Sequence, residues 1–209
     1  MIDVSKPQFQ EDLIMKNPWF AFAGICTLVL GIVLFSVIFG GYSSFLRSQN
    51  RIEAAKDLVI VQCRNQLGQA QKLVDLPGTS AQARDSLLET AQAAVKVVDR
   101  MDKTDSPLAP ELILEYEAVQ VRVNDTINKF LQEAQIKENK TLEQFKEMET
   151  AVFITGKKYN KAARYFNTRV QVFPGFIIAR LFGLDKIYFP EIAVDRLTPL
   201  SGKEVAGAS

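Results

Sequence analysis

Residues 19–39 read WFAFAGICTLVLGIVLFSVIF, and this stretch decides the fold class of the chain. No charged residue interrupts residues 17–46, which lie between Lys16 and Arg47. A bilayer core of about 30 Å is crossed by about 20 apolar helical residues. The thirteen Leu, Ile, Val and Phe residues of the stretch favour insertion by roughly 4–8 kcal/mol in total. The stretch therefore predicts one membrane-spanning helix over residues 17–46.

A cleaved signal peptide is the alternative interpretation of the same stretch. A signal h-region is about 7–15 residues long and is followed by a cleavage site of small residues. Residues 19–39 are longer than that, and the only weak candidate for a cleavage site is GGYSS at residues 40–44. We therefore expect an uncleaved anchor, preceded by a polar tail over residues 1–16.

Positive charges flank the predicted span unequally. Two lysines precede the span, Lys6 and Lys16. Four basic residues follow it, namely Arg47, Arg51, Lys56 and Arg64. The positive-inside rule counts charges within about 20 residues of a span, so this excess favours the cytoplasmic side for the domain that follows.

The composition excludes several classes of function. Histidine is absent and the formal net charge is +1, so the commonest general base and metal ligand is missing and nothing indicates a nucleic-acid partner. The sequence has no P-loop, no G-x-S-x-G and no C-x-x-C. Glu147 and Glu149, like Glu115 and Glu117, stand two apart and therefore face different directions on a helix, and we interpret these glutamates as solvated surface charges. We predict a protein that is not an enzyme, without cofactor or small-molecule substrate.

Beyond residue 46, apolar residues recur at intervals of three and four, as on one face of an α-helix. Four such segments follow one another, at residues 47–74, 80–101, 107–136 and 142–170. Their apolar stripes include Ile52, Cys63, Leu87, Leu88, Leu112, Tyr116, Phe145 and Phe166. No helix breaker separates the span from the first segment, which predicts one continuous helix there. The segments would be about 33–45 Å long at 1.5 Å per residue. Similar lengths and short loops predict an all-α fold over residues 47–189, an antiparallel, coiled-coil-like bundle with up-down-up-down topology.

The boundaries of these helices have uneven sequence support. Thr79 with Gln82, and Thr141 with Gln144, have the spacing of a capping box. The polar run QIKENKT at residues 135–141 contains neither Gly nor Pro. We place a turn at residues 137–140, and one continuous helix over the third and fourth segments is the competing prediction.

The end of the fourth segment is basic and is followed by a short apolar run. No acidic residue lies between Glu149 and Asp185. Lys157, Lys161 and Arg164 share one helical face, opposite Tyr159, Phe166 and Val170. Residues 176–184 predict a short amphipathic helix that also carries Arg180 and is too short to span. That helix either lies in the membrane interface or packs on the bundle. Residues 190–209 predict an irregular tail.

The residues around this region resemble a known family. The dipeptides Tyr159-Asn160 and Phe166-Asn167 stand seven apart, Phe173-Pro174 follows, and Gly183 and Tyr188-Phe189 come in order. This pattern is similar to that of the LemA family, single-pass bacterial membrane proteins with a bundle of long helices. Phe166 stands where the family has Tyr, and Leu184 where it has Phe. The resemblance covers residues 149–191, is weaker over residues 42–67, and implies the bacterial cytoplasmic membrane but no catalytic residues.

Two functions are compatible with this pattern. The first is an anchored scaffold or accessory subunit that binds other membrane proteins or further copies of itself. The second is a lipid-surface-binding or membrane-remodelling module that uses residues 157–184. In the second, Lys157, Lys161, Arg164 and Arg180 face lipid; the alternative is that these charges only solvate the surface. Asn160 and Asn167 are predicted to bond to the first helix and set its register, as buried Asn does in coiled coils.

Overall fold

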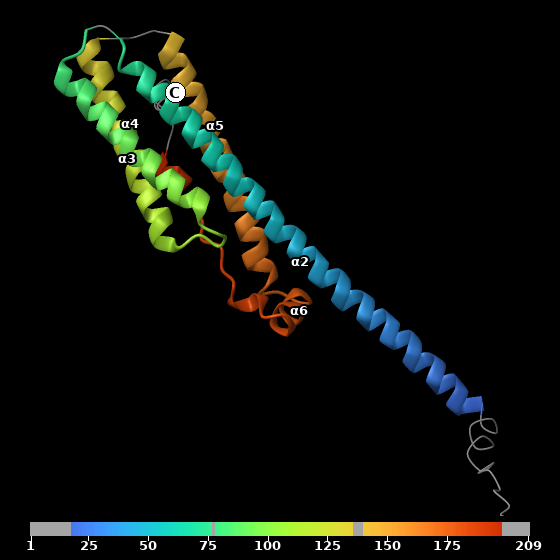
Figure 1. Ribbon diagram of the computed structural model, residues 1–209. Coiled ribbons are helices and arrows are strands. Elements are labelled where there is room, and N and C mark those ends of the chain that lie inside the picture. The colour runs from blue at the N-terminus through green and yellow to red at the C-terminus, as the bar shows by residue number, and fades with distance from the viewer. Residues whose placement is uncertain (1–17, 77, 136–139, 198–209) are drawn as a thin grey trace, which may run out of the picture. The chain divides into compact units, whose positions relative to one another are not determined.

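The structure is a computed structural model that describes residues 18–76, 78–135 and 140–197. Over these residues it contains helices and no strand, which confirms the predicted all-α class. Figure 1 shows the elements in order. They are α2 (Pro18–Leu73), α3 (Ala81–Lys103), α4 (Pro110–Ala134), α5 (Lys140–Arg169), α6 (Gly175–Leu181) and the 3-10 turns η1 (Leu184–Lys186) and η2 (Val194–Leu197).

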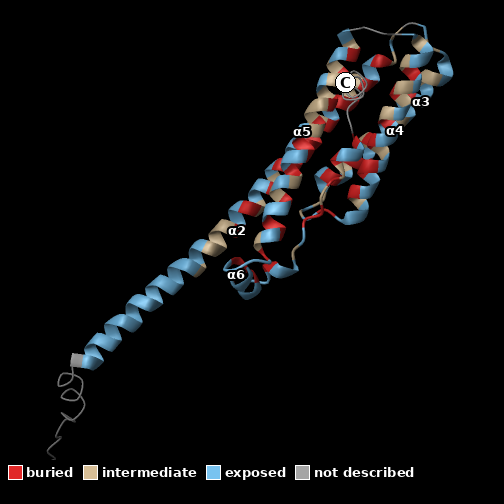
Figure 2. Cartoon of the chain, turned by 180° about the vertical axis from the view of Figure 1, so that it is seen from behind, coloured by how far each residue is buried: buried red, intermediate tan, exposed pale blue. Residues whose placement is uncertain are grey.

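The apolar stretch lies in the first half of α2. All residues from 19 to 37 are exposed (Figure 2), and the most apolar part has a mean hydropathy of 2.7. By length and composition, α2 is the one helix of the described residues that is suited to cross a membrane. The helix continues unbroken to Leu73, as the absence of a breaker predicted.

The chain divides after Ser44 into two units, and the second begins at Phe45. The core of the second unit is formed by the predicted apolar stripes. Ile52, Cys63, Tyr116, Phe145 and Phe166 are all buried. Two stripe members differ from the prediction, because Leu88 is exposed beside the buried Leu87 and Leu112 is only half-buried beside the buried Ile113. At 3.6 residues per turn, one of two adjacent apolar residues points toward the core.

The helix ends follow local chemistry. Ser80, not Thr79, caps α3, since its hydroxyl oxygen accepts a hydrogen bond from the Ala83 N–H at 3.2 Å. Pro110 occupies the first turn of α4, where its missing N–H costs nothing. Gln135 ends that helix in the left-handed region at φ 52°. The described residues therefore give two helices, α4 and α5. Of the turn predicted at residues 137–140, residues 137–139 lie outside the described residues and Lys140 belongs to α5.

Polar contacts connect the helices of the second unit both at the surface and in the core. Arg64 of α2 donates to Asp99 and Asp102 of α3, at 2.8 and 2.9 Å. The Cys63 thiol of α2 lies 3.1 Å from the Tyr116 hydroxyl of α4. These contacts bring α2 against both α3 and α4.

A buried lysine makes a further link between α2 and the end of α3. Lys56 is buried, forms an ion pair with Glu53 and donates to the Thr104 carbonyl oxygen at 3.0 Å. That carbonyl belongs to the residue that follows α3. The lysine thus places a positive charge at a helix C-terminus, where the helix dipole favours it.

Candidate functional site

A short non-helical segment, residues 189–193, lies between η1 and η2 and is held by side chains of α5; we call it the strap. Asn167 donates from Nδ2 to the Phe189 carbonyl at 2.7 Å, and its Oδ1 accepts from the Phe189 N–H at 3.0 Å. Asn160 does the same with Ile192, at 2.6 and 2.8 Å. Each amide therefore satisfies both backbone groups of one strap residue.

The spacing of the two asparagines matches the geometry of the strap. Seven residues of α-helix rise about 10.5 Å. Three residues of extended chain cover about 10 Å. Asn160 and Asn167 lie seven apart on one helical face, while their partners Ile192 and Phe189 are three apart. The seven-residue repeat of Asn in the sequence is thus the repeat that a non-helical segment lying along α5 requires.

Three further residues complete the attachment of the strap. The Tyr159 hydroxyl donates to the Pro190 carbonyl at 3.1 Å. On α4, the buried Glu117 accepts from the Ala193 N–H at 2.7 Å. The Phe166 ring meets the Phe189 ring edge-on, with centroids 5.0 Å apart. The strap therefore contacts both α4 and α5, and Phe189 itself is 2% exposed.

The sequence predictions for these residues were partly right. Tyr159 and Phe166 are buried, as their place in the apolar stripe indicated. The prediction that Asn160 and Asn167 bond to the first helix is wrong, because both amides bond to the strap. The prediction that Glu117 and Glu149 are solvated surface charges is wrong, because both side chains are buried. The signal for Glu117 is its position beside Tyr116 on the buried face of α4, where a carboxylate needs a partner.

The strap and η2 approach α5 closely enough to explain a glycine in that helix. A Cβ atom at Gly156 would lie 2.7 Å from the Val194 side chain. Glycine in a helix interior costs roughly 0.5–1 kcal/mol relative to alanine. Glycine at position 156 therefore lowers the helix propensity of α5 but allows η2 to pack closely against it. Residues 190–197, predicted as the start of an irregular tail, pack through the buried Ile192, Val194 and Leu197.

The titratable groups of the core are poorly suited to nucleophilic chemistry. Burial raises the pKa of the Cys63 thiol to about 12, against the weaker opposing effect of hydrogen bonds from Tyr116 and Gln120. Burial also raises the pKa of Tyr159 to about 12. A neutral thiol is a weak nucleophile. In the part of the chain that the structure describes, no group of three His, Cys, Asp or Glu residues is placed to hold a metal ion.

A set of exposed apolar side chains follows α5, and we call it the α6 patch. Its members are Val172, Phe173, Phe176, Ile177, Leu181, Phe182 and Tyr188. Phe173 is 77% exposed and Leu181 is 63% exposed. The opposite face of α6 is buried through Ile178 and Ala179. Large exposed apolar patches mark interaction sites in soluble proteins or sites that lie against a membrane.

Two turns that contain glycine set the path of the chain at the patch. A Cβ atom at Gly175 would lie 2.3 Å from the Arg169 carbonyl oxygen, so only glycine fits there without a backbone shift. Gly183 has φ 69°, a left-handed conformation that favours glycine. Pro174 is exposed between the patch residue Phe173 and Gly175. These turns fold α6 back against the end of α5.

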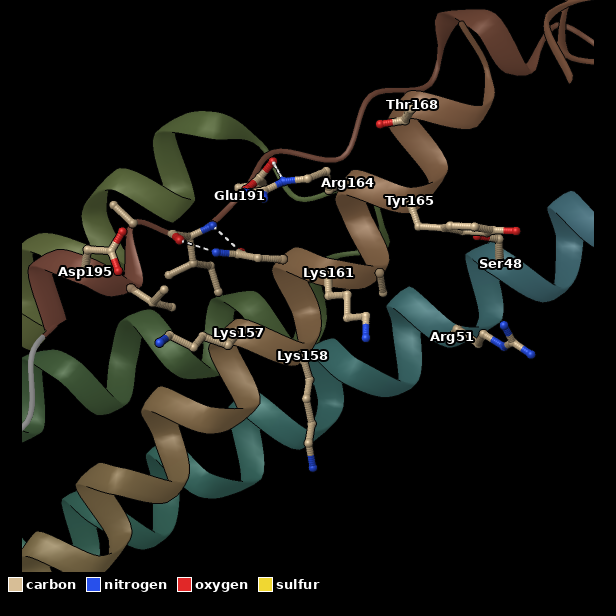
Figure 3. A pocket seen from close by; sticks show the side chains of 15 residues that line it. Ser48, Arg51, Lys157, Lys158, Lys161, Arg164, Tyr165, Thr168, Glu191 and Asp195 are labelled. Atoms are coloured by element: carbon tan, nitrogen blue, oxygen red, sulfur yellow. Dashed lines mark hydrogen bonds and ion pairs between the residues drawn. The ribbon is translucent and has the colours of Figure 1, made fainter. Parts of the chain in front are cut away.

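Three of the four predicted basic residues lie together, and the fourth does not. Lys157, Lys161 and Arg164 line one open depression of about 990 Å³ (Figure 3), and Arg180 is not among its lining residues. Arg164 is paired with Glu191 of the strap at 2.6 Å, and Lys157 lies 4.2 Å from the centre of the Phe153 ring. Arg180 lies on α6. The basic residues of α5 and of α6 therefore belong to two different places.

No family model, curated protein or solved structure matches this chain. The resemblance to the LemA family stays a prediction carried by the residues quoted above.

Proposed function

We propose that this chain is a non-enzymatic, single-pass membrane-anchored protein whose helical domain is a scaffold or accessory subunit of a membrane protein assembly. The observation that carries the proposal is the exposure of every residue from 19 to 37. A helix apolar on all sides is stable only when lipid or protein covers it. The length of the stretch is that of a bilayer core.

The proposal includes an antiparallel bundle in the second unit. Arg100 near the end of α3 pairs with Glu115 near the start of α4. The Ser80 N–H at the start of α3 donates to Glu133 near the end of α4 at 2.8 Å. Phe45, early in the second unit, meets Phe166, late in α5, with ring centroids 5.7 Å apart. Such pairings support neighbouring helices of opposite direction, joined by short loops.

The proposed location is the bacterial cytoplasmic membrane, and the support is the LemA-like signature. The structure supplies a physical role for most of that signature. Tyr159, Asn160, Phe166 and Asn167 hold the strap, and Phe189 is the strap residue that fills the core. The excess of basic residues after the span supports a cytoplasmic domain.

Membrane fractionation and crosslinking test the proposal together. We expect the full chain to stay with membranes after alkaline carbonate extraction, and Val33→Arg to increase the extracted fraction relative to it, because a central Arg removes about 3 of the roughly 4–8 kcal/mol that favour insertion. Leu114→Arg on the exposed surface of α4 is the matched control. We also expect crosslinking in native membranes to trap other membrane proteins or copies of this chain. Release of the unchanged chain by carbonate, or a monomer without any adduct, would contradict the proposal.

A second candidate function, a lipid-surface-binding module, is favoured by the α6 patch. Phe173, Phe176 and Leu181 are large apolar side chains that are 77%, 42% and 63% exposed. A short amphipathic element with aromatic residues is typical of the membrane interface. The two functions are compatible, because an anchored scaffold can also rest on its membrane.

A further inference from the structure

We infer that the α6 patch is a second membrane contact, which inserts into the headgroup region of the bilayer that the predicted span crosses. The inference rests on the proposed anchor and names the surface that its domain meets. The occupant is an anionic phospholipid bilayer, with the rings of Phe173 and Phe176 in the interface and Arg180 at the phosphates.

The first support is that α6 presents the patch from a fixed position. Ile178 and Ala179 bury the inner face of α6, and Leu184 follows as a further buried residue. Gly175 brings the chain so close to the Arg169 carbonyl that a Cβ atom would not fit. The outer side chains are therefore exposed by the packing of the element and not by a loose end. An exposed apolar face on a packed element is typical of a surface that binds a protein partner or a membrane.

The second support is the length of chain between the predicted span and the end of α5. The guanidinium carbon of Arg169 lies 4.7 Å from the centre of the Phe45 ring. Phe45 follows Phe39, the last residue of the apolar stretch, by six residues. Six residues reach at most about 22 Å, and about 9 Å when helical. Chain connectivity alone thus keeps the end of α5, from which α6 continues, within a short distance of the predicted membrane.

The third support is charge. No acidic residue lies between Glu149 and Asp185, so the charged residues that accompany the patch along the sequence from Val172 to Phe182 are cations, Arg169 before it and Arg180 within it. Cations near an anionic leaflet strengthen binding over about a Debye length, roughly 8 Å. Phe and Tyr rings are also suited to the interface. Except for the Tyr188 hydroxyl, the patch side chains offer no hydrogen-bonding group with which a partner protein could be specified.

The inference separates α6 from the basic face of α5. Lys161 and Lys157 precede Arg169 by 8 and 12 residues, or about 12 and 18 Å along the helix. Both distances exceed the Debye length of roughly 8 Å. Charge reversal at these two lysines is therefore expected to leave the membrane contact of α6 unchanged, whereas Arg180→Glu weakens it.

Spin labels on the full chain, reconstituted in vesicles of phosphatidylcholine with or without phosphatidylglycerol, test the inference. Single cysteines replace Leu181 in the patch, Leu114 on α4 as an equally apolar control at 59% exposure, and Val33 in the span. Cys26 is changed to Ser, and Cys63 is buried. We expect the Leu181 label to be open to oxygen and shielded from a water-soluble nickel complex several-fold more than the Leu114 label. The shielding should increase with phosphatidylglycerol and decrease in Arg180→Glu.

The Val33 label keeps failure of the inference apart from failure of the anchor. If the Val33 label is in lipid and the Leu181 label is as open to nickel as the Leu114 label, the second contact is wrong and the anchor stands. Shielding of the Leu181 label from both reagents means that protein covers the patch, which also overturns the inference. An equal loss in the Lys157→Glu, Lys161→Glu double variant would move the contact to α5 and overturn it. A Val33 label open to nickel would contradict the anchor itself.

Discussion

Replacing Asn167 with alanine is expected to release the strap. Asn167 is 8% exposed, and its amide is the partner of both backbone groups of Phe189. In the variant the Phe189 N–H and carbonyl would stay buried without partners. A buried polar group that loses its partner costs about 1–3 kcal/mol, so the two together cost about 2–6 kcal/mol. Native stabilities are about 5–15 kcal/mol, and the loss is therefore a large fraction of the whole.

Hydrogen exchange at the strap measures this effect directly. With tenfold for each 1.4 kcal/mol, a loss of about 2 kcal/mol raises the exchange rate of the strap amides by roughly 30-fold. The full chain in detergent micelles is the sample, and urea unfolding of its helical signal gives the global loss. The increase is expected at Phe189 and Ile192 first, since strap opening does not require the helices to separate.

Asn50→Ala is the matched control for this substitution. Asn50 is an exposed residue in α2, and exposed substitutions usually change stability by less than about 0.5 kcal/mol. Asn160→Ala is expected to fall between the two, because that amide makes the same pair of hydrogen bonds but is only half-buried. If Asn167→Ala raises strap exchange no more than Asn50→Ala does, the amide does not hold the strap and the explanation of the Asn spacing fails.

Three further predictions concern the second unit. Gly175→Ala is expected to destabilise it by about 1–3 kcal/mol in urea unfolding, because the new Cβ atom meets the Arg169 carbonyl oxygen. Gly68→Ala, where the new Cβ atom on α2 meets open space, should stabilise it by up to about 1 kcal/mol. Equal effects of the two substitutions would refute the close approach at Gly175. The free energy of unfolding should fall as pH rises above the unfolded pKa values of about 8.5 for Cys and 10 for Tyr. Burial raises the pKa of Cys63 and of Tyr159 to about 12, so above those unfolded values the unfolded chain releases protons that the folded chain keeps. Tyr159→Phe should reduce the slope of the free energy of unfolding against pH. In a Cys26→Ser background, the Cys63 thiol should react with an impermeant maleimide only after urea unfolding, because the native side chain is fully buried. Fast labelling of the folded protein would show that α2 separates from α4 at the contact between Cys63 and Tyr116.

The membrane-spanning candidate and the helical class were readable from the sequence because both depend on local properties. Residues 19–37 are exposed in the folded chain because so long an apolar stretch does not fit in a small protein core. Its length and apolarity match a bilayer core instead. The end of α2 at Leu73 follows from Pro77-Gly78, and the start of α4 from Pro110. Each of these signals acts within a few residues of the place where it is observed.

The sequence does not determine the register within the stripes, since adjacent apolar residues compete for one buried position. Leu87 is buried and Leu88 exposed, while Ile113 is buried in place of Leu112. A helix rotation of 100° per residue decides which of two neighbours faces the core. That rotation depends on the packing of the whole helix and cannot be read from the pair itself.

The sequence by itself determined that this chain has one span-length apolar helix, amphipathic helices beyond it and an Asn repeat of seven on the last long helix. The repeat is a property of one helix and says that two amides share a face. The folded chain decided what that face meets: a non-helical segment 22 residues or more further on, whose backbone groups Asn160, Asn167 and Glu117 satisfy. Because the partners are backbone atoms, which every residue carries, no side-chain pattern in the sequence marks them, and only the packing of α4, α5 and the strap brings them together.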